Sequence, residues 1–261
     1  MSYATVTTRG AGAEGGGGRA ASRGVWCTDA SVGTVARIVR SGIDWVCVDM
    51  QHGRYGRAEL VEIARTVNLA GASVPLGVRV PSSESTGIGF ALDAGARIVI
   101  VPQVESADEA RRVVEATFYP PIGRRSWGPL TPSWGATATT PEEANPTIVC
   151  AAMIESANAI AQVEEIAAVP GLSMLFIGPF DLALSLGTTV PALLDADAQE
   201  SVFAHVRDVA HAHGLRVGAF GGDPATSAAL AGLGIDDVAW VTDGWLLGEG
   251  LRSAFLVETS D

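Results

Sequence analysis

Residues 75–101 read PLGVRVPSSESTGIGFALDAGARIVIV, and this stretch sets the repeating unit of the chain. An apolar, β-rich run leads into a segment with helical patterning that closes at Gly95, and a second apolar run follows directly. Both runs are apolar on both faces, which is typical of strands buried in a parallel sheet. The stretch therefore predicts a strand–helix–strand unit whose two strands are parallel.

The same unit recurs from Val25 to the end of the chain, which predicts an α/β fold of the (β/α)8 TIM barrel type. Eight consecutive units without a break for a second domain favour a closed barrel over a doubly wound sheet, the alternative architecture. The predicted strands are residues 24–28, 44–49, 75–80, 96–101, 147–154, 172–178, 215–220 and 237–242. The predicted helices are residues 30–41, 57–70, 84–95, 106–116, 156–167, 195–213, 223–232 and 243–257.

Composition limits the partners and the compartment. The chain has 261 residues and a formal net charge of −12, so its surface repels nucleic acid and anionic membranes, and we expect neither as a partner. Its three cysteines lack the spacing of a zinc site and fit buried thiols in a reducing cytoplasm. We expect the glycine-rich residues 1–20 to form a flexible tail without a secretory signal, and residues 21–261 to form one barrel domain.

In a closed parallel barrel the active site lies at the C-terminal ends of the strands, so candidate residues are sought only there. Five polar residues end or follow the second, third, fifth and sixth predicted strands: Asp49, His52, Arg79, Glu155 and Asp181. Four of them have an ordinary structural alternative. Asp49 could cap the loop, and His52 could be a solvated loop histidine. Glu155 could be an acid at a helix start, and Asp181 a helix N-cap. Arg79 is more informative, because an arginine between two valines of a buried strand needs an anionic partner or the open mouth.

Taken together, these residue types indicate metal-assisted chemistry. Two carboxylates at adjacent strand ends can bind a hard divalent cation, and the lack of cysteine and paired histidine ligands favours Mg²⁺, Mn²⁺ or Co²⁺. A nearby arginine can bind an anionic substrate group or a developing enolate oxygen, while a histidine or a metal-bound hydroxide supplies a base. This set suits proton transfer or carbon–carbon cleavage next to a carbonyl. The chain contains no lysine, which excludes a Schiff-base mechanism.

Several ordered segments resemble the HpcH/HpaI aldolase family, the metal-dependent class II pyruvate aldolases such as 4-hydroxy-2-oxoheptanedioate aldolase. The resemblance runs from about residue 24 over nearly the whole chain and rests on GIDWVCVDMQHG, VRVP, ALDAGARIVIVPQVESADEARRVVEATFYPPIGRRSWG, MIES and FIGPFDLALSLG. It implies a carbon–carbon lyase that cleaves 4-hydroxy-2-oxo acids reversibly to pyruvate and an aldehyde through a pyruvate enolate. It also implies a homo-oligomer, a trimer or a hexamer, in which the apolar last helix packs onto a partner.

The resemblance also implies a role for particular residues. Glu155 and Asp181 would be the metal ligands, and Arg79 would hold the keto oxygen and stabilise the pyruvate enolate. The backbone at the start of the helix that follows the sixth predicted strand would bind the pyruvate carboxylate. The substrate-binding residues there would be Gly178, Pro179 and Phe180.

His52 would belong to the acid–base apparatus, with Asp49 close by. Asp93, in ALDAG, matches a family acid that pairs with the histidine. Its place near a helix end, away from the mouth, suggests that a neighbouring subunit supplies it. Two positions depart from the family pattern: Gln51 stands where the family commonly has a glutamate, and Met153 where a glutamine is common. We therefore expect Gln51 to bind substrate and to alter substrate range.

Two other functions stay open. An acyl-CoA lyase like the citrate lyase β relatives would need a basic groove for the CoA phosphates; the acidic balance opposes this, although Arg124 and Arg125 leave it open. A barrel recruited only as a scaffold would be indifferent to Glu155→Ala. The long connection 117–146 is predicted to be a functional loop or an oligomer contact.

Overall fold

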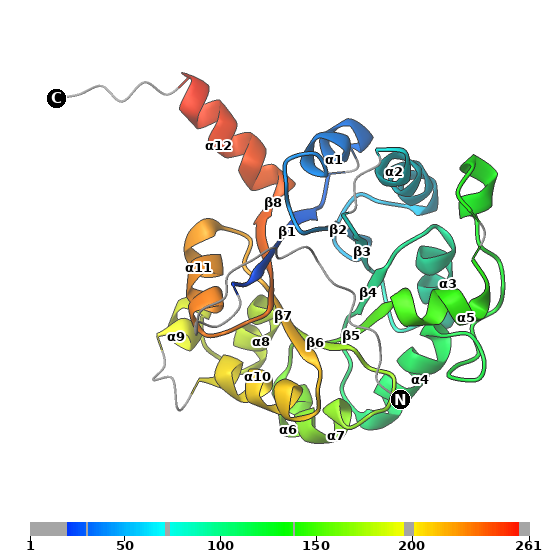
Figure 1. The fold of residues 1–261 in the computed structure, drawn as a ribbon. Coiled ribbons are helices and arrows are strands. Elements are labelled where there is room, and N and C mark those ends of the chain that lie inside the picture. Colours follow the sequence, from blue (N-terminus) through cyan, green and yellow to red (C-terminus); the bar gives the residue numbers. More distant parts are fainter. Residues whose placement is uncertain (1–19, 30, 71–73, 138, 196–200, 256–261) are drawn as a thin grey trace, which may run out of the picture.

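The structure, a computed structural model, describes residues 20–29, 31–70, 74–137, 139–195 and 201–255. Eight parallel strands, β1 to β8, close into a barrel in sequence order, with β8 pairing back onto β1 (Figure 1). The predicted (β/α)8 barrel is therefore confirmed. The predicted tail lies outside the described residues except for Ala20. None of the described helices is both long enough and apolar enough to span a membrane.

The strands and helices follow the predicted alternation. The strands are β1 Ser22–Cys27, β2 Trp45–Asp49, β3 Leu76–Arg79, β4 Ile98–Val101, β5 Val149–Ile154, β6 Met174–Ile177, β7 Arg216–Phe220 and β8 Asp237–Thr242. The α-helices are α1 Val32–Ile38, α2 Arg57–Leu69, α3 Ser85–Asp93, α4 Ala107–Thr117, α5 Pro141–Ala144, α6 Ala157–Ala161, α7 Val163–Ala167, α8 Pro179–Ser185, α9 Val190–Leu194, α10 Val202–Ala212, α11 Pro224–Gly232 and α12 Asp243–Phe255. Two 3₁₀ helices, η1 Thr131–Trp134 and η2 Asn145–Thr147, lie in the long connection before β5.

Two predicted helices differ from the observed ones. The segment 156–167 is divided into α6 and α7, because Gln162 leaves helical geometry and its N–H donates to the carbonyls of both Asn158 and Ala159. Within the segment predicted at 195–213, α10 runs from Val202 to Ala212, and the Ser201 side chain accepts the Ala204 N–H and caps its first turn; residues 196–200 lie outside the described residues.

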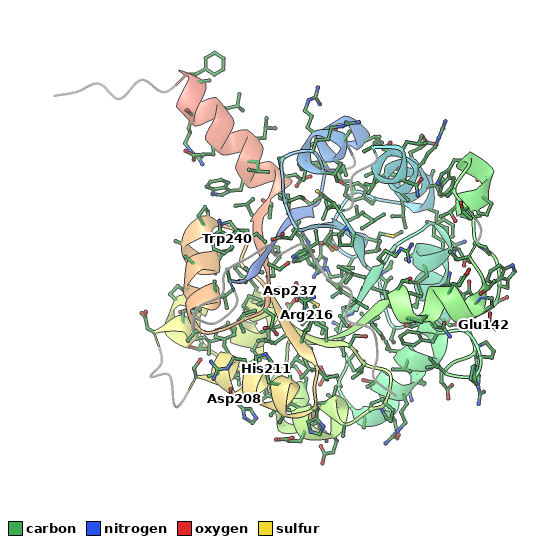
Figure 2. The ribbon with its side chains drawn as sticks, viewed as in Figure 1. Glu142, Asp208, His211, Arg216, Asp237 and Trp240 are labelled. Atoms are coloured by element: carbon green, nitrogen blue, oxygen red, sulfur yellow. The ribbon has the colours of Figure 1, made fainter. Side chains whose placement is uncertain are left out.

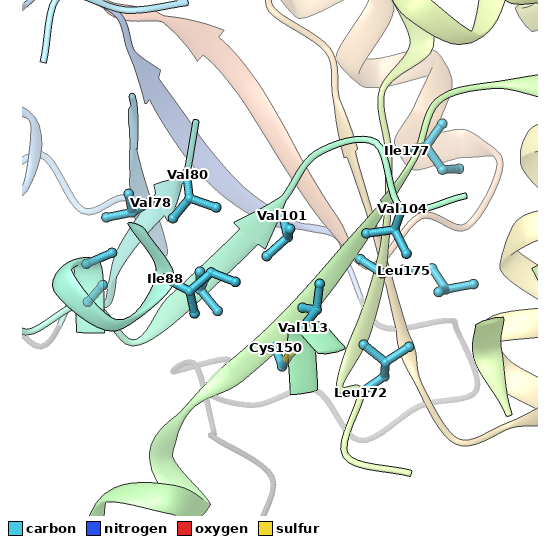
Figure 3. Close-up of a cluster of buried hydrophobic side chains, with 14 of the residues drawn as sticks. Val78, Val80, Ile88, Val101, Val104, Val113, Cys150, Leu172, Leu175 and Ile177 are labelled. Carbon is cyan, nitrogen blue, oxygen red and sulfur yellow. The ribbon is translucent and has the colours of Figure 1, made fainter. Parts of the chain in front are cut away.

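The core has two layers. Inside the barrel, alternate residues of most strands meet around the large side chains of Trp26, Trp45 and Phe176. Between strands and helices, the other alternate residues form a second cluster. Figure 3 shows part of this cluster, to which strand residues such as Val101 and Leu175 and helix residues such as Ile88 and Val113 all belong. Strands buried on both faces explain the continuous apolar runs of the sequence.

This alternation also fixes the direction of the polar strand-end residues. Trp45 and Cys47 point into the barrel, so Asp49, two residues further on, points into its mouth. Ala151 and Met153 of β5 also point into the barrel, so Glu155, which directly follows β5, points into the mouth as well. The β2–β3 register places Asp49 directly opposite Arg79.

Candidate active site

A buried ion pair joins the ends of β2 and β3. Arg79 Nε donates to Asp49 Oδ1 at 2.9 Å, and Arg79 Nη2 donates to Asp49 Oδ2. Both residues are almost fully buried, with Asp49 1% and Arg79 8% exposed. Asp49 is thus the anionic partner that the sequence required for Arg79.

The remaining contacts of Asp49 hold its neighbourhood in place. Trp26 Nε1 donates to Oδ2 at 3.2 Å, and the backbone N–H groups of Gln51 and His52 donate to Oδ1 at 3.0 and 3.2 Å. Burial alone would raise the pKa of Asp49, but the hydrogen bonds and charge of Arg79, with the His52 amide and Trp26, lower it overall. Asp49 is therefore an ionised carboxylate that orients Arg79 and the loop carrying His52.

Glu155 follows β5 and is 5% exposed. Its Oε1 accepts the Gln103 N–H at 2.7 Å, whereas its Oε2 is buried without a hydrogen-bond partner among the described residues. Burial raises the pKa of Glu155; the Gln103 amide opposes this, and the negative charge of Asp181 adds to it. The charge of Arg79 also acts on the pKa of Glu155, so all three ionisable groups lie at one mouth.

The backbone forms a tight cradle around Glu155. Gln103 adopts the left-handed conformation at φ 54°, which a non-glycine residue adopts at a cost in free energy, and its N–H thereby reaches Glu155. On the other side, a Cβ added to Gly178 would lie 2.7 Å from Glu155 Oε2. The site therefore depends on an unfavourable backbone conformation and on a glycine.

Asp181 lies exposed in the first turn of α8, and Gly178 is the N-cap of that helix. The alternative interpretation of Asp181 as the N-cap is therefore wrong. The Gly178 N–H already donates to the Ile154 carbonyl at 3.2 Å, and proline has no N–H. Of residues 178–180, only Phe180 thus brings an N–H that could bind a carboxylate.

The loop after β2 carries the two other candidates at the mouth. The His52 side chain is exposed, and Gln51 Oε1 is buried without a hydrogen-bond partner among the described residues. Gly53 packs so closely that a Cβ there would lie 2.1 Å from the Asp49 carbonyl oxygen. The loop therefore presents an accessible imidazole and an unpaired amide oxygen.

The structure does not bring Asp93 to these residues. Asp93 is the last residue of α3, at the opposite end of the barrel, and its Oδ1 accepts from Arg125 Nη2 at 2.6 Å. Burial raises the pKa of Asp93, although Arg125 opposes the shift. The exposed histidines His205 and His211 lie on α10 and His213 is its C-cap; Figure 2 shows His211 on the outer ring.

Two residues of the mouth were missed by the sequence reasoning. Trp26 holds Asp49, and its ring lies 5.2 Å from the Arg79 guanidinium carbon. Asp243, buried at the start of α12, accepts the N–H groups of Thr28 and Asp29, both at 3.0 Å, and so fixes the loop after β1. Trp26 lies inside the first predicted strand and Asp243 directly follows the eighth, but an apolar tryptophan and a helix-start aspartate gave no catalytic signal.

The donor set fits a hard divalent cation. A buried carboxylate oxygen without a partner, beside a second carboxylate, is an arrangement that a cation stabilises. No cluster of three or more His, Cys, Asp or Glu that could hold a metal occurs among the described residues. A cation at this mouth would therefore be coordinated by Glu155 and Asp181, and its other coordination positions would be open to substrate and water.

Known proteins resemble the chain over most of its length. Residues 23–227 match a family model described as HpcH/HpaI aldolase/citrate lyase. A hydroxypyruvate/pyruvate aldolase of Rhizorhabdus wittichii is 37% identical over 217 residues, which cover 82% of this chain and 85% of the relative. A 2-dehydro-3,6-dideoxy-6-sulfogluconate aldolase of Pseudomonas putida is 37% identical over 209 residues, covering 79% of this chain and 80% of the relative.

Solved structures agree with this similarity. The crystal structure of a HpcH/HpaI aldolase/citrate lyase family protein from Burkholderia cenocepacia J2315 has a TM-score of 0.82 and 29% sequence identity to this chain. The similarity covers 91% of this chain and 94% of that one.

Proposed function

This chain belongs to the HpcH/HpaI aldolase/citrate lyase family, and from that premise we propose that it is a divalent-metal-dependent class II pyruvate aldolase. It is a carbon–carbon lyase that cleaves 4-hydroxy-2-oxo acids reversibly to pyruvate and an aldehyde. The observation that carries the metal-dependent mechanism is the unpartnered Oε2 of Glu155, buried at the mouth beside Asp181 and Arg79.

Glu155 and Asp181 would hold the metal, which we expect to be Mg²⁺, Mn²⁺ or Co²⁺ because the donors are carboxylate oxygens. When bound there, such an ion polarises the keto carbonyl of the substrate and acidifies the adjacent carbon. The Gln103 N–H holds the Glu155 carboxylate in position, and the lack of a Cβ at Gly178 leaves room for it. Phe180 contributes a backbone N–H for the substrate carboxylate.

Arg79 would donate hydrogen bonds to the keto oxygen and stabilise the negative charge that develops there. Its Nε and Nη2 are already engaged by Asp49, so the guanidinium is held in one orientation before substrate arrives. Preorganised donors of this kind stabilise a developing oxyanion without reorganisation during the reaction. Asp49 acts through Arg79 and is a positioning residue in this proposal.

His52 would take the proton from the C4 hydroxyl group in the cleavage direction. The C3–C4 bond then breaks, the aldehyde leaves, and the electron pair enters the enolate that Arg79 stabilises. Return of this proton from His52 to C3, directly or through water, completes pyruvate and restores the base. Gln51 Oε1, buried and without a partner among the described residues, would accept a hydrogen bond from a substrate hydroxyl or from water.

Metal removal tests this mechanism. We expect EDTA treatment followed by desalting to abolish retro-aldol cleavage, measured as pyruvate release from a 4-hydroxy-2-oxo acid. Mg²⁺, Mn²⁺ or Co²⁺ should restore the rate, because both protein ligands are oxygen donors. Unchanged activity after rigorous chelation would contradict the metal-dependent mechanism. Oxaloacetate decarboxylation, assayed in parallel, reports enolate formation without the need for the correct aldehyde.

The last helix supports the proposal of a homo-oligomer, a trimer or a hexamer. Figure 1 shows α12 extending away from the barrel, and Leu247, Leu251 and Phe255 are 62%, 51% and 76% exposed. A stripe of large apolar side chains at helical spacing is stabilised when a second surface covers it. In such an assembly a neighbouring subunit would supply Asp93 to the mouth. The buried thiols are compatible with a reducing cytoplasm as the compartment.

The assembly can be tested on the helix itself. We expect Leu247→Asp combined with Leu251→Asp to reduce the sedimentation coefficient to that of a smaller species, because burying either carboxylate would cost free energy. Ser253→Asp, which adds one charge to the exposed helix, is the matched control and should leave the assembly intact. A wild-type chain that sediments as a monomer would contradict the proposal.

A further inference from the structure

A cavity of about 350 Å³ lies between the barrel wall and the long connection before β5. Figure 1 shows this connection running beside α3, and the Leu130 N–H donates to the Asp93 carbonyl at 2.8 Å to hold it there. Asn145 fixes its first part, because its side chain exchanges two hydrogen bonds with the backbone of Tyr119. The volume falls within the range of about 300–1,000 Å³ that is typical of small-molecule sites.

The charged groups that line this cavity are both cationic. They are Arg97 and Arg125, and no Asp or Glu is among the described residues that line it, although Asp93 pairs with Arg125 from behind the wall. Tyr119, Trp127 and several threonines supply aromatic and hydroxyl surface. In a chain of net charge −12, two arginines on one cavity wall favour an anionic ligand there.

Arg125 brings a buried donor without a partner among the described residues to the wall of this cavity. Its side chain is only 4% exposed, one Nη2 hydrogen bond goes to Asp93, and its Nε is buried without a hydrogen-bond partner among the described residues. The guanidinium also stacks over the Tyr119 ring at 4.4 Å from the centroid. A buried, oriented and unsatisfied guanidinium N–H is a donor that an oxyanion satisfies.

The cavity is separate from the mouth of its own barrel. Arg97 precedes β4, and Thr147 and Ile148 precede β5, so these lining residues stand at the N-terminal ends of the strands. Glu155 lies beyond the opposite end of β5, roughly 20 Å away along an extended strand. A ligand in the cavity would therefore not touch the residues assigned to catalysis in the same chain.

We propose that this cavity is a second binding site, for a small organic anion with an oxyanion head and a flat apolar body. Arg125 Nε and the Arg97 guanidinium bind the head. The Tyr119 and Trp127 rings, whose centroids are 5.3 Å apart, contact the body. Arg97 already donates to the Thr147 hydroxyl group, which fixes it at the cavity wall.

Titration calorimetry with benzoate and phenyl phosphate tests the site on the full-length protein, treated with EDTA and kept at low ionic strength. We expect saturable binding of at least one probe, and at least tenfold weaker binding of the neutral analogue benzamide. Preference for benzoate or for phenyl phosphate identifies the head group as a carboxylate or a phosphate. If neither binds, or if benzamide binds equally well, the proposal is wrong.

Variants of the two cavity arginines test whether the probe binds in this cavity. Arg97→Gln, at an exposed position, should weaken binding at least tenfold, and Arg125→Lys, which keeps the charge but removes Nε, should do the same. Arg111→Gln, which removes an exposed arginine of α4, is the matched control and should bind like wild type. Binding that survives both cavity variants lies elsewhere and overturns the proposal. Displacement of the probe by Mg²⁺ with saturating pyruvate would assign it to a mouth, and would also overturn it.

Discussion

Glu155→Gln is expected to reduce kcat for retro-aldol cleavage by about 10³-fold or more while the barrel stays folded. The change removes the negative charge but keeps the shape of a side chain whose Oε2 has no partner among the described residues. Metal-ion stabilisation contributes several kcal/mol to such reactions, and each 1.36 kcal/mol corresponds to a tenfold change in rate. Mn²⁺ binding, measured by electron paramagnetic resonance, should be lost together with activity.

The neighbouring strand end offers a matched control. Glu105 follows β4 and accepts hydrogen bonds from the Ser156 hydroxyl group and the Asn158 amide, so its carboxylate is already satisfied. Glu105→Gln should retain Mn²⁺ binding and leave kcat within a few-fold of wild type. A Glu155→Gln enzyme that keeps wild-type activity would eliminate both the assigned ligand and the mechanism. It would favour a scaffold role only if wild type also proved inactive.

Arg79→Ala has two expected effects. The first is a loss of about 10²–10³-fold in kcat, because the donor for the enolate oxygen is removed. The second is a loss of about 3–5 kcal/mol in the free energy of unfolding, because Asp49 would remain buried without its partner. Steady-state kinetics at a temperature where the variant is folded, with urea unfolding, measures the two effects separately.

Arg79→Lys separates orientation from charge. Lysine keeps the positive charge but cannot form the two-point contact with Asp49, so stability should be partly restored while kcat stays low. If lysine restores full activity, the fixed orientation of the guanidinium is not needed and the role proposed for Asp49 is wrong.

The pH dependence of stability gives an independent check on the ion pair. The pKa of Asp49 lies below its ordinary value of 3.8, so its contribution to stability is complete above about pH 4. That contribution is lost as the pH falls through the folded-state pKa. The stability difference between wild type and Arg79→Ala should therefore be largest near neutral pH and smaller in acid.

The barrel itself could be predicted because its signal is local. Apolar runs such as residues 75–80 alternate with helical patterns, and each element carries its own periodicity and its own end signals. The same local reading placed Asp49, Arg79 and Glu155 at the ends of strands and so at the mouth. It failed where a boundary depends on a cap or a single residue, as at Ser201 and Gln162.

The sequence by itself determined the eight strand–helix units, the polar residues at the strand ends and the absence of a lysine for Schiff-base chemistry. Only the tertiary structure decided which groups meet. Arg79 donates hydrogen bonds to Asp49, 30 positions away, and the Gln103 N–H donates to Glu155, 52 positions away. Asp93 accepts a hydrogen bond from Arg125 and does not approach His52 of the same chain. The reason is physical: such contacts depend on strand register, barrel closure and the left-handed backbone of Gln103, none of which a local pattern records.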